Sequence, residues 1–206
     1  DGNLKEMQIS RFTVDLPGAF SLKGGGILEN LTDSLTRSGT IGLDMVTQNL
    51  NFLTGLTGVT PDGSLVVPDS MSLKMKMEMN GPQYKAKLDL KEGKGSMNVN
   101  AALNSSTEVY TADLKINDLQ LHHFLPKDLI YELSLSADAK GRGLDVMSFH
   151  SLANLNLSLD QLHYARYHLS NVHLTGNLKG ALVTAQLTSD NELLKMTADA
   201  EYNLAH

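Results

Sequence analysis

Four methionines lie within the segment MSLKMKMEMN at positions 71–80, where apolar and polar residues alternate. Thioether sulfur is a soft ligand, so a copper(I) site is the first chemistry to consider. In a strand, however, Met75, Met77 and Met79 would point to one face about 7 Å apart per step, which is wide for one ion. The chain has no cysteine, and no nearby histidine completes the ligand set. We predict no metal here and leave two alternatives open, the protein's own core or an adaptable binding surface, because methionine suits both.

Histidines are the second group that could bind a metal. Adjacent residues of an extended chain point to opposite faces, so His122 and His123 are a poor joint ligand set. Three others are spaced by five residues and should alternate between faces in the same way. We expect the histidines to be exposed or satisfied by local partners. The seven are His122, His123, His150, His163, His168, His173 and His206.

Glycine clusters occur at 24–26, 93–95 and 141–143. A phosphate-binding loop needs a helix directly after its glycines, and none of these clusters is followed by a helical pattern. Hairpin turns or kinks at a sheet edge explain them better. The basic residue inside the second and third clusters is expected in a solvated turn, although contact with a lipid headgroup is an alternative.

Enzyme signatures are missing from the sequence. There is no nucleophile elbow, no HExxH, no EF-hand loop and no acid and base pair that stands out. We predict that the protein is not an enzyme, has no catalytic residues and needs no cofactor.

Charge and composition limit the classes of binding partner and site that the chain can have. The net charge is −6 and lysines and arginines are spread singly, which argues against nucleic acid. The absence of cysteine excludes disulfides and zinc-thiolate sites. No signal peptide and no apolar run of membrane-spanning length is present, so we expect a fragment of a longer protein whose anchor lies elsewhere.

A period of two dominates the chain and predicts strands. Turn signals such as Asn80-Gly81-Pro82 and Ser189-Asp190-Asn191 separate the runs, which is typical of an antiparallel meander. Helical candidates are short, Asn49 to Leu56 and Leu121 to Leu125, with Leu31 to Arg37 ambiguous. Residues 57–70 read as a loop. The alternating runs lie at 71–79, 84–90, 97–103, 112–116, 129–139, 155–159, 172–174, 183–187 and 194–202.

The predicted fold is all-β, an elongated and mostly antiparallel sheet with only short helical turns. Residues 41–56 weakly echo 112–126, which favours a repeated array over a closed enzyme fold. We expect one elongated unit over 1–206, with weak repeats at about 9–60 and 71–126 and a further strand array at 127–205. Without a long amphipathic helix to cover it, the apolar face must fold over, pair with another copy or remain a groove, and such a groove marks a binding site.

Laid out in this way, the chain resembles the TamB and AsmA-like family of bacterial envelope proteins. The likeness is closest to the DUF490-type C-terminal region of TamB as found in Bacteroides-like bacteria. It covers most of residues 9–205 and rests on the order of strands and turns. The segments that carry it are ILENLTDSLTRSGTIGLDMVTQNLNFLTGL, NGPQYKAKLDLKEGKGSMNVNAALN, ADLKINDLQLHHFLPKDLIYELSLSADAKGRGLD and YHLSNVHLTGNLKGALVTAQLTSDNELLKMTADAEYNL.

The resemblance implies a curved sheet folded into an apolar groove, a repeating β-groove also called a β-taco. It implies a periplasmic segment of a Gram-negative protein anchored in the inner membrane. That protein would carry phospholipid acyl chains to the outer membrane, support outer-membrane assembly and work with a TamA-like Omp85 barrel. The residues expected to line the groove are Met71, Leu73, Met75, Met77, Met79, Leu88, Leu90, Met97, Val99, Leu114, Ile116, Leu133, Leu135, Leu155, Leu157 and Met196.

Two other functions fit the same pattern. A chaperone-like scaffold would use the groove or the sheet edge to bind unfolded outer-membrane strands. A purely structural β protein would instead close its apolar face into a dry core.

Overall fold

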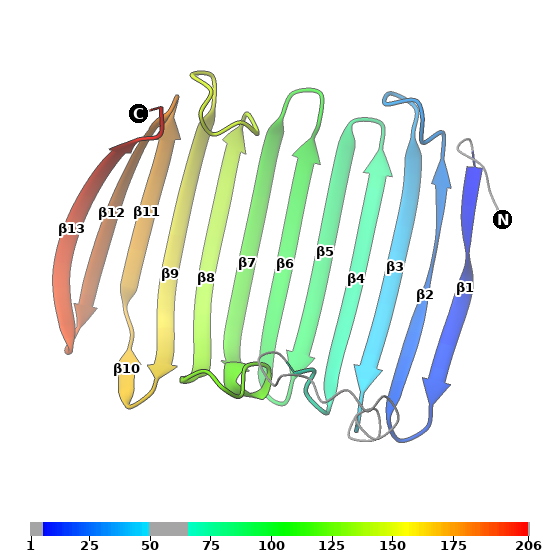
Figure 1. The fold of residues 1–206 in the computed structure, drawn as a ribbon, viewed down its shortest axis with the longest axis horizontal. Coiled ribbons are helices and arrows are strands. Elements are labelled where there is room, and N and C mark those ends of the chain that lie inside the picture. Colours follow the sequence, from blue (N-terminus) through cyan, green and yellow to red (C-terminus); the bar gives the residue numbers. More distant parts are fainter. Residues whose placement is uncertain (1–5, 50–65, 206) are drawn as a thin grey trace.

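The protein is a single antiparallel sheet of thirteen strands, seen in a computed structural model that describes residues 6–49 and 66–205 (Figure 1). The alternating sequence pattern accounts for the strands, because each run places one set of side chains on either face. The all-β prediction is confirmed. The strands are β1 (Glu6–Leu16), β2 (Phe20–Glu29), β3 (Ser38–Thr47), β4 (Met71–Asn80), β5 (Gln83–Glu92), β6 (Gly95–Asn104), β7 (Val109–Gln120), β8 (Ile130–Arg142), β9 (Leu152–Tyr164), β10 (Tyr167–Leu169), β11 (Val172–Lys179), β12 (Leu182–Asn191) and β13 (Leu194–Asn203).

The strands follow one another in space as they do in sequence. The order runs from β1 to β9 and then through β11, β12 and β13, while the short β10 pairs only with β9. Tight turns make this possible. Gly81, Gly93 and Gly180 begin two-residue connections with positive φ, a conformation that glycine adopts without steric cost. The predicted antiparallel meander is therefore confirmed.

The glycines at 24–26 do not form a hairpin turn, because they lie inside β2. They pair with β1 where that strand has a bulge between Ile9 and Phe12. A Cβ atom on Gly24 would stand 2.6 Å from the ring of Phe12, so this glycine makes room for a large neighbour. The turn interpretation was wrong for this cluster, whereas Gly93 and Gly143 do lie in connections and have positive φ.

Cross-strand register arranges the side chains in rows that run across the sheet. Alternate rows belong to opposite faces. One row, which defines the apolar face, consists of Ile9, Gly26, Ile41, Met77, Ala86, Ala101, Ala112, Ala139, Leu155, Gly176, Ala185 and Ala200. A row on the other side, which defines the polar face, consists of Thr13, Lys23, Asp44, Lys74, Asp89, Asn98, Lys115, Ser136, Ser158, His173, Thr188 and Thr197.

Little of the apolar surface is buried. Among the described residues only six apolar side chains are buried, namely Ala19, Met71, Leu90, Ile116, Leu119 and Ala181. The chain exposes 13399 Å². A compact protein of its mass, 22.4 kDa, would expose about 9,400 Å². The sheet is therefore a single layer over most of its length.

A small core forms at the lower end of the strands, the bottom of Figure 1. The 3₁₀ turn η1 (Leu121–His123) folds back there, and Leu121 and Phe124 pack against the cluster of Met71, Leu90, Ile116 and Leu119. The helical prediction for Leu121 to Leu125 is confirmed in its first three residues. The candidate at Asn49 to Leu56 lies outside the described residues from position 50 onward, and Leu31 to Arg37 contains turns.

Thr47 joins the end of β3 to the segment that leads into β4. Its buried hydroxyl donates to the Pro68 carbonyl at 2.7 Å and accepts from the Met71 N–H at 3.0 Å. Thr47→Val should lower the free energy of unfolding by about 1–3 kcal/mol, because it leaves a buried N–H without its partner. Urea denaturation measures this. The matched change at exposed Thr111 should stay within about 0.5 kcal/mol, and equal effects at the two sites would contradict the assignment.

Candidate apolar groove

A groove of about 570 Å³ crosses the apolar face toward the upper end of the strands. It extends from β2 to β7, five strand spacings or about 24 Å, which is long enough for an extended fatty acyl chain. Its apolar walls come from Leu28, Leu31, Ile41, Met77, Met79, Tyr84, Leu103, Tyr110 and Leu144.

The floor of the groove is made of small side chains. Ala86, Ala101, Ala112 and Ala139 are cross-strand partners on four successive strands, and the first three line the groove. The next row of the same face on one side contains Met79, Tyr84, Leu103 and Tyr110, and on the other Met75, Leu88, Val99 and Leu114. A row of methyl groups between two rows of large side chains produces a trough that runs across the strands.

Arg37 stabilises the upper rim. It ties three connections together, because its Nε donates to the Gly81 carbonyl at 3.1 Å and its Nη2 to Ser105 Oγ at 3.3 Å. The guanidinium also lies 5.0 Å from the centre of the Tyr84 ring, a cation–π contact. Leu31 and Leu144, which line the groove, belong to loops at this end. The trough therefore has a structured wall above it.

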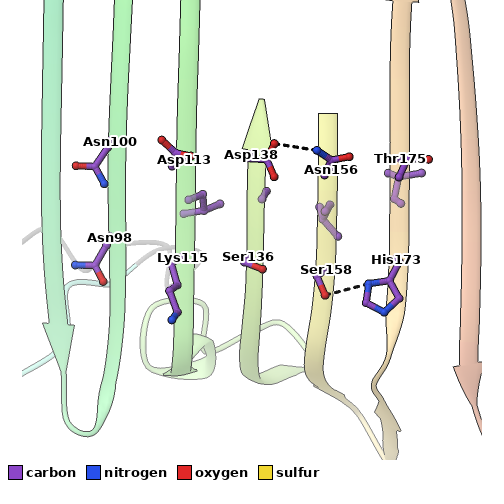
Figure 2. Close-up of a pocket in the computed structure, with 14 residues that line it drawn as sticks. Asn98, Asn100, Asp113, Lys115, Ser136, Asp138, Asn156, Ser158, His173 and Thr175 are labelled. Atoms are coloured by element: carbon purple, nitrogen blue, oxygen red, sulfur yellow. Dashed lines mark hydrogen bonds between the residues drawn. The ribbon is translucent and has the colours of Figure 1, made fainter. Parts of the chain in front are cut away.

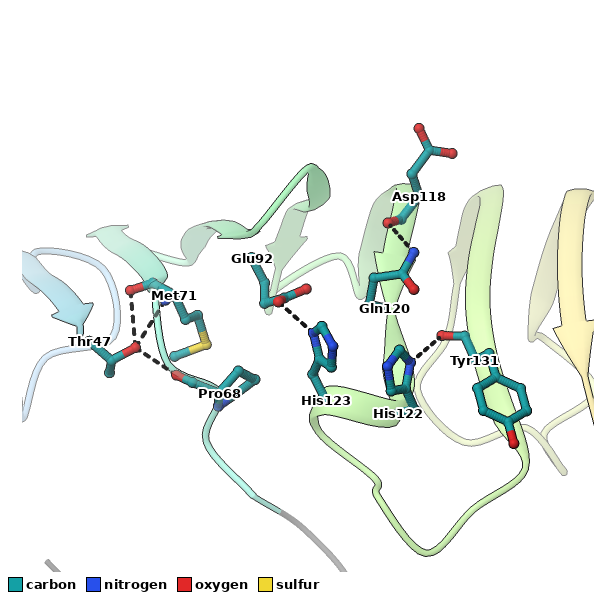
Figure 3. A network of polar contacts seen from close by, with 9 residues as sticks. All are labelled: Thr47, Pro68, Met71, Glu92, Asp118, Gln120, His122, His123 and Tyr131. Carbon is teal, nitrogen blue, oxygen red and sulfur yellow. Dashed lines mark hydrogen bonds and ion pairs between the residues drawn. The ribbon is translucent and has the colours of Figure 1, made fainter. Parts of the chain in front are cut away.

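The lower end of the apolar face is closed by the core around η1. Figure 3 shows His123 pointing from η1 toward Glu92 at the end of β5. His123 Nδ1 lies 2.7 Å from Glu92 Oε1, and the Glu92 side chain is only 6% exposed. The second carboxylate oxygen of Glu92 has no hydrogen-bond partner. Since a buried carboxylate is costly without partners, this contact holds η1 over the sheet.

His123→Ala should destabilise the protein by about 1.5–3 kcal/mol, because it removes the hydrogen bond to a buried carboxylate. Chemical denaturation followed by circular dichroism provides the measurement. His150→Ala is the control, since this side chain is exposed, and its effect should be below about 0.5 kcal/mol. If the two variants are equally stable, the contact does not hold η1.

His122 and His123 lie in the 3₁₀ turn η1, so the geometry of an extended chain does not apply to them, and their rings approach to 4.1 Å. The expected alternation of faces is wrong for His163 and His168, which are direct partners across the β9–β10 hairpin and whose rings stack at 4.1 Å. Tyr131 lies between the two pairs, 5.6 Å from His122 and 4.9 Å from His163. Within the described residues, no group of three or more His, Asp or Glu side chains forms a metal site.

All sixteen side chains predicted to line the groove lie on the apolar face, as the register requires. They divide into two groups. Met71, Leu90 and Ile116 are buried in the lower core and do not line an open surface, and Leu73, Leu88, Met97, Leu114, Leu133 and Leu135 pack against them. Outside this core lie Met75, Met77, Met79, Val99, Leu155, Leu157 and Met196, and among them Met77 and Met79 line the groove.

Most residues of the groove were not predicted from the sequence. Tyr84, Tyr110 and the alanine floor were not among the predicted residues, although they share the alternating pattern. Only the register shows that the alanines of different strands form one row. Leu31 and Leu144 lie in loops, where the periodicity of the sequence does not predict which face of the sheet a side chain lies against.

The polar face carries a separate, shallow depression of about 340 Å³ (Figure 2). Short polar side chains line it in two rows, and some bond to one another across strands. Asn156 Nδ2 donates to Asp138 Oδ2 at 2.9 Å, and Ser158 Oγ lies 3.1 Å from His173 Nδ1. Asp160 contacts Ser158 and not His173, so no described carboxylate holds this imidazole as a catalytic triad requires.

Charges are concentrated on the polar face. A hydrogen bond from Lys76, together with its positive charge, lowers the pKa of the Glu78 carboxyl, and the charges of Lys85 and Lys87 lower it further. Glu78 is therefore ionised at neutral pH. An acyl chain has no favourable contact on such a surface, so the two faces differ sharply in what they can bind.

Comparison with protein-family models, with curated proteins and with solved structures finds no match. The resemblance to the TamB and AsmA-like family therefore stays a prediction. In the described part of the chain, no helix combines the length and apolar character needed to cross a bilayer.

Proposed function

We propose that this chain binds the fatty acyl chains of phospholipids along its apolar face, with the headgroups left in water. In this proposal it is the periplasmic segment of a Gram-negative envelope protein whose groove carries lipid between the inner and outer membranes. Anchoring in the inner membrane and contact with a TamA-like barrel belong to other parts of the parent protein.

The observation that carries the proposal is the open apolar face. Above the lower core, no described segment forms a second layer, and Met77 is 45% exposed and Leu155 36% exposed. Uncovered apolar surface costs about 25 cal/mol for each Å², so a bound apolar ligand stabilises the sheet. The trough needs no specific hydrogen bonds from its ligand, which suits acyl chains.

The apolar face is uncovered toward the upper end of the strands, which argues against a purely structural protein with a closed core. A scaffold for unfolded outer-membrane strands is the remaining alternative, because a strand can pair with a sheet edge. The arrangement of the side-chain rows favours lipid over an unfolded strand. The trough runs across the strands, so it presents no backbone N–H or C=O groups with which a bound strand could pair.

Native mass spectrometry of the purified protein, combined with lipid extraction, tests the proposal. We expect phospholipid to co-purify, and delipidated protein to take up a fluorescent fatty acid. Absence of both lipid and uptake would overturn the proposal. Binding of unfolded outer-membrane protein without lipid uptake would favour the scaffold.

A further inference from the structure

We propose that the upper end of strands β7 to β12 docks on the surface of a phospholipid bilayer that contains anionic lipid. The docking surface has two parts, an apolar tip on the connection between β8 and β9 and a row of exposed apolar and cationic side chains beside it. This inference goes beyond the proposed function, because the surface can dock whether or not the groove holds an acyl chain.

The apolar tip consists of Val146, Met147 and Phe149. All three side chains are exposed, and Phe149 is 82% exposed, the highest value of any large apolar side chain in the described residues. Figure 1 shows this connection at the upper end of the sheet, beyond the ends of the strands. Apolar side chains that protrude into water gain free energy when a bilayer takes them up, and a bilayer needs no complementary pocket to do so.

Hydrogen bonds hold the connection in a fixed shape. Ser151 Oγ donates to the Asp145 carbonyl at 2.5 Å, and the Met147 N–H donates to Asp145 Oδ1 at 3.0 Å. The Gly180 N–H donates to the Ser151 carbonyl at 2.8 Å, which ties the connection to the turn after β11. The tip therefore belongs to an ordered segment, so docking loses little conformational entropy.

The register places a row of exposed side chains beside the tip, on the polar face. Leu152 is 48% exposed and lies between Arg142 on β8 and Lys179 on β11. Lys140 adds a third cation on the same face, two residues from Arg142. Apolar groups next to cations suit the boundary between acyl chains and phosphate groups. Across five neighbouring strands the row alternates between apolar and cationic members, which are Val109, Arg142, Leu152, Lys179 and Leu182.

The three cations can reach phosphate groups. All are exposed, and no ion pair within residues 6–49 and 66–205 involves Lys140, Arg142 or Lys179. The carboxylates of Glu108 and Asp145, in connections at this end, accept hydrogen bonds from backbone N–H groups of the β8–β9 connection. Anionic headgroups complement the charge of this row, and each lysine or arginine near an anionic bilayer strengthens binding.

The same connection reaches the groove, because Leu144 is part of the groove wall. Docking at this end therefore brings the upper rim of the groove to the bilayer surface. Passage of a lipid from the bilayer into the groove at this point rests on the proposed function, whereas docking does not.

Tryptophan fluorescence tests insertion of the tip, because the chain has no tryptophan of its own. Phe149→Trp places the probe at the tip, and Leu193→Trp places it in an exposed turn at the opposite end of the sheet. With vesicles of phosphatidylglycerol and phosphatidylcholine, we expect a blue shift at position 149 and quenching by brominated acyl chains. Position 193 should show neither. No shift at position 149, or the same shift at both positions, would overturn the proposal.

Co-sedimentation with the same vesicles tests the contribution of the apolar tip. The variant carries Met147→Ser and Phe149→Ser, which remove apolar surface from exposed positions and leave the sheet unchanged by circular dichroism. Its affinity for the vesicles should fall at least about tenfold.

Charge removal tests the row in the same assay. The docking variant carries Lys140→Gln, Arg142→Gln and Lys179→Gln, and its affinity should also fall at least about tenfold. A matched control removes three exposed cations toward the lower end of the strands, beyond the screening length from the bilayer, and should bind within about twofold of the parent protein. The control carries Lys91→Gln, Lys94→Gln and Lys115→Gln. Equal losses in the two charge variants would overturn the proposal.

Fatty-acid uptake by the same proteins separates this proposal from the proposed function. The tip variant and the docking variant should take up fatty acid as the parent protein does. Vesicle binding that neither variant weakens overturns docking and leaves acyl-chain binding standing. A parent protein that docks on vesicles but takes up no fatty acid supports docking and contradicts the proposed function.

Discussion

Leu119→Glu should unfold the protein, whereas Met77→Glu should leave the sheet intact. Leu119 is 3% exposed in the lower core, and Met77 is 45% exposed on the same face. A charge without a partner in the core costs at least about 4 kcal/mol once the lost leucine burial is included, a large part of a typical stability. At Met77 the carboxylate reaches water, so the loss should be at most about 1 kcal/mol.

Urea denaturation of both variants gives the comparison directly. Both variants introduce a glutamate on the same face of the sheet. The main difference between the two sites is therefore whether the side chain is buried or exposed. If Met77→Glu unfolds the protein as Leu119→Glu does, the upper apolar face is sealed and the groove is a core. If both variants are stable, the lower cluster is not a core.

Ala101→Trp should block the groove. Ala101 lies in the alanine floor, and an indole ring there fills the trough between the larger rows. Removing about 60 Å² of apolar contact from a bound acyl chain is worth about 1.5 kcal/mol, so affinity for a fluorescent fatty acid should fall about tenfold. Titration by fluorescence measures the change.

The neighbouring residue supplies the control. Asn100 is in register with Lys87 and Asp113 on the polar face and does not line the groove, so Asn100→Trp adds the same ring on the other side of the sheet. Its fatty-acid affinity should match that of the parent protein. Equal losses in the two variants would indicate a general effect on the sheet, and no loss in either would place the ligand elsewhere.

The strands from β4 onward, apart from the short β10, could be predicted from the sequence, because their alternation is regular and glycine or asparagine marks many of the turns. The strands β1 and β2 were not predicted. The bulge at Ser10 and Arg11 breaks the period of β1, and three glycines in β2 imitate a turn. The alternation of apolar and polar residues is therefore broken in β1 and β2, although pairing with neighbouring strands stabilises both.

The sequence predicts which face of the sheet the candidate site residues occupy. It does not predict which of them are buried by other parts of the chain. Alternation identifies Met71 and Met77 as members of one face, yet Met71 is buried and Met77 is open. The difference arises because η1 folds back over one end of the sheet, a non-local contact. The stacked His163 and His168 are a similar case, since the turn at Ala165 brings them together.

Site-specific photo-crosslinking in a Gram-negative envelope tests lipid binding on the apolar face most directly. A diazirine amino acid is placed at Met77 or Ala112 on the apolar face, and at Lys76 or Asp113 on the polar face. We expect phospholipid adducts by mass spectrometry at the first two positions and none at the other two. Equal adducts on both faces, or adducts only to protein at Met77 and Ala112, would contradict it.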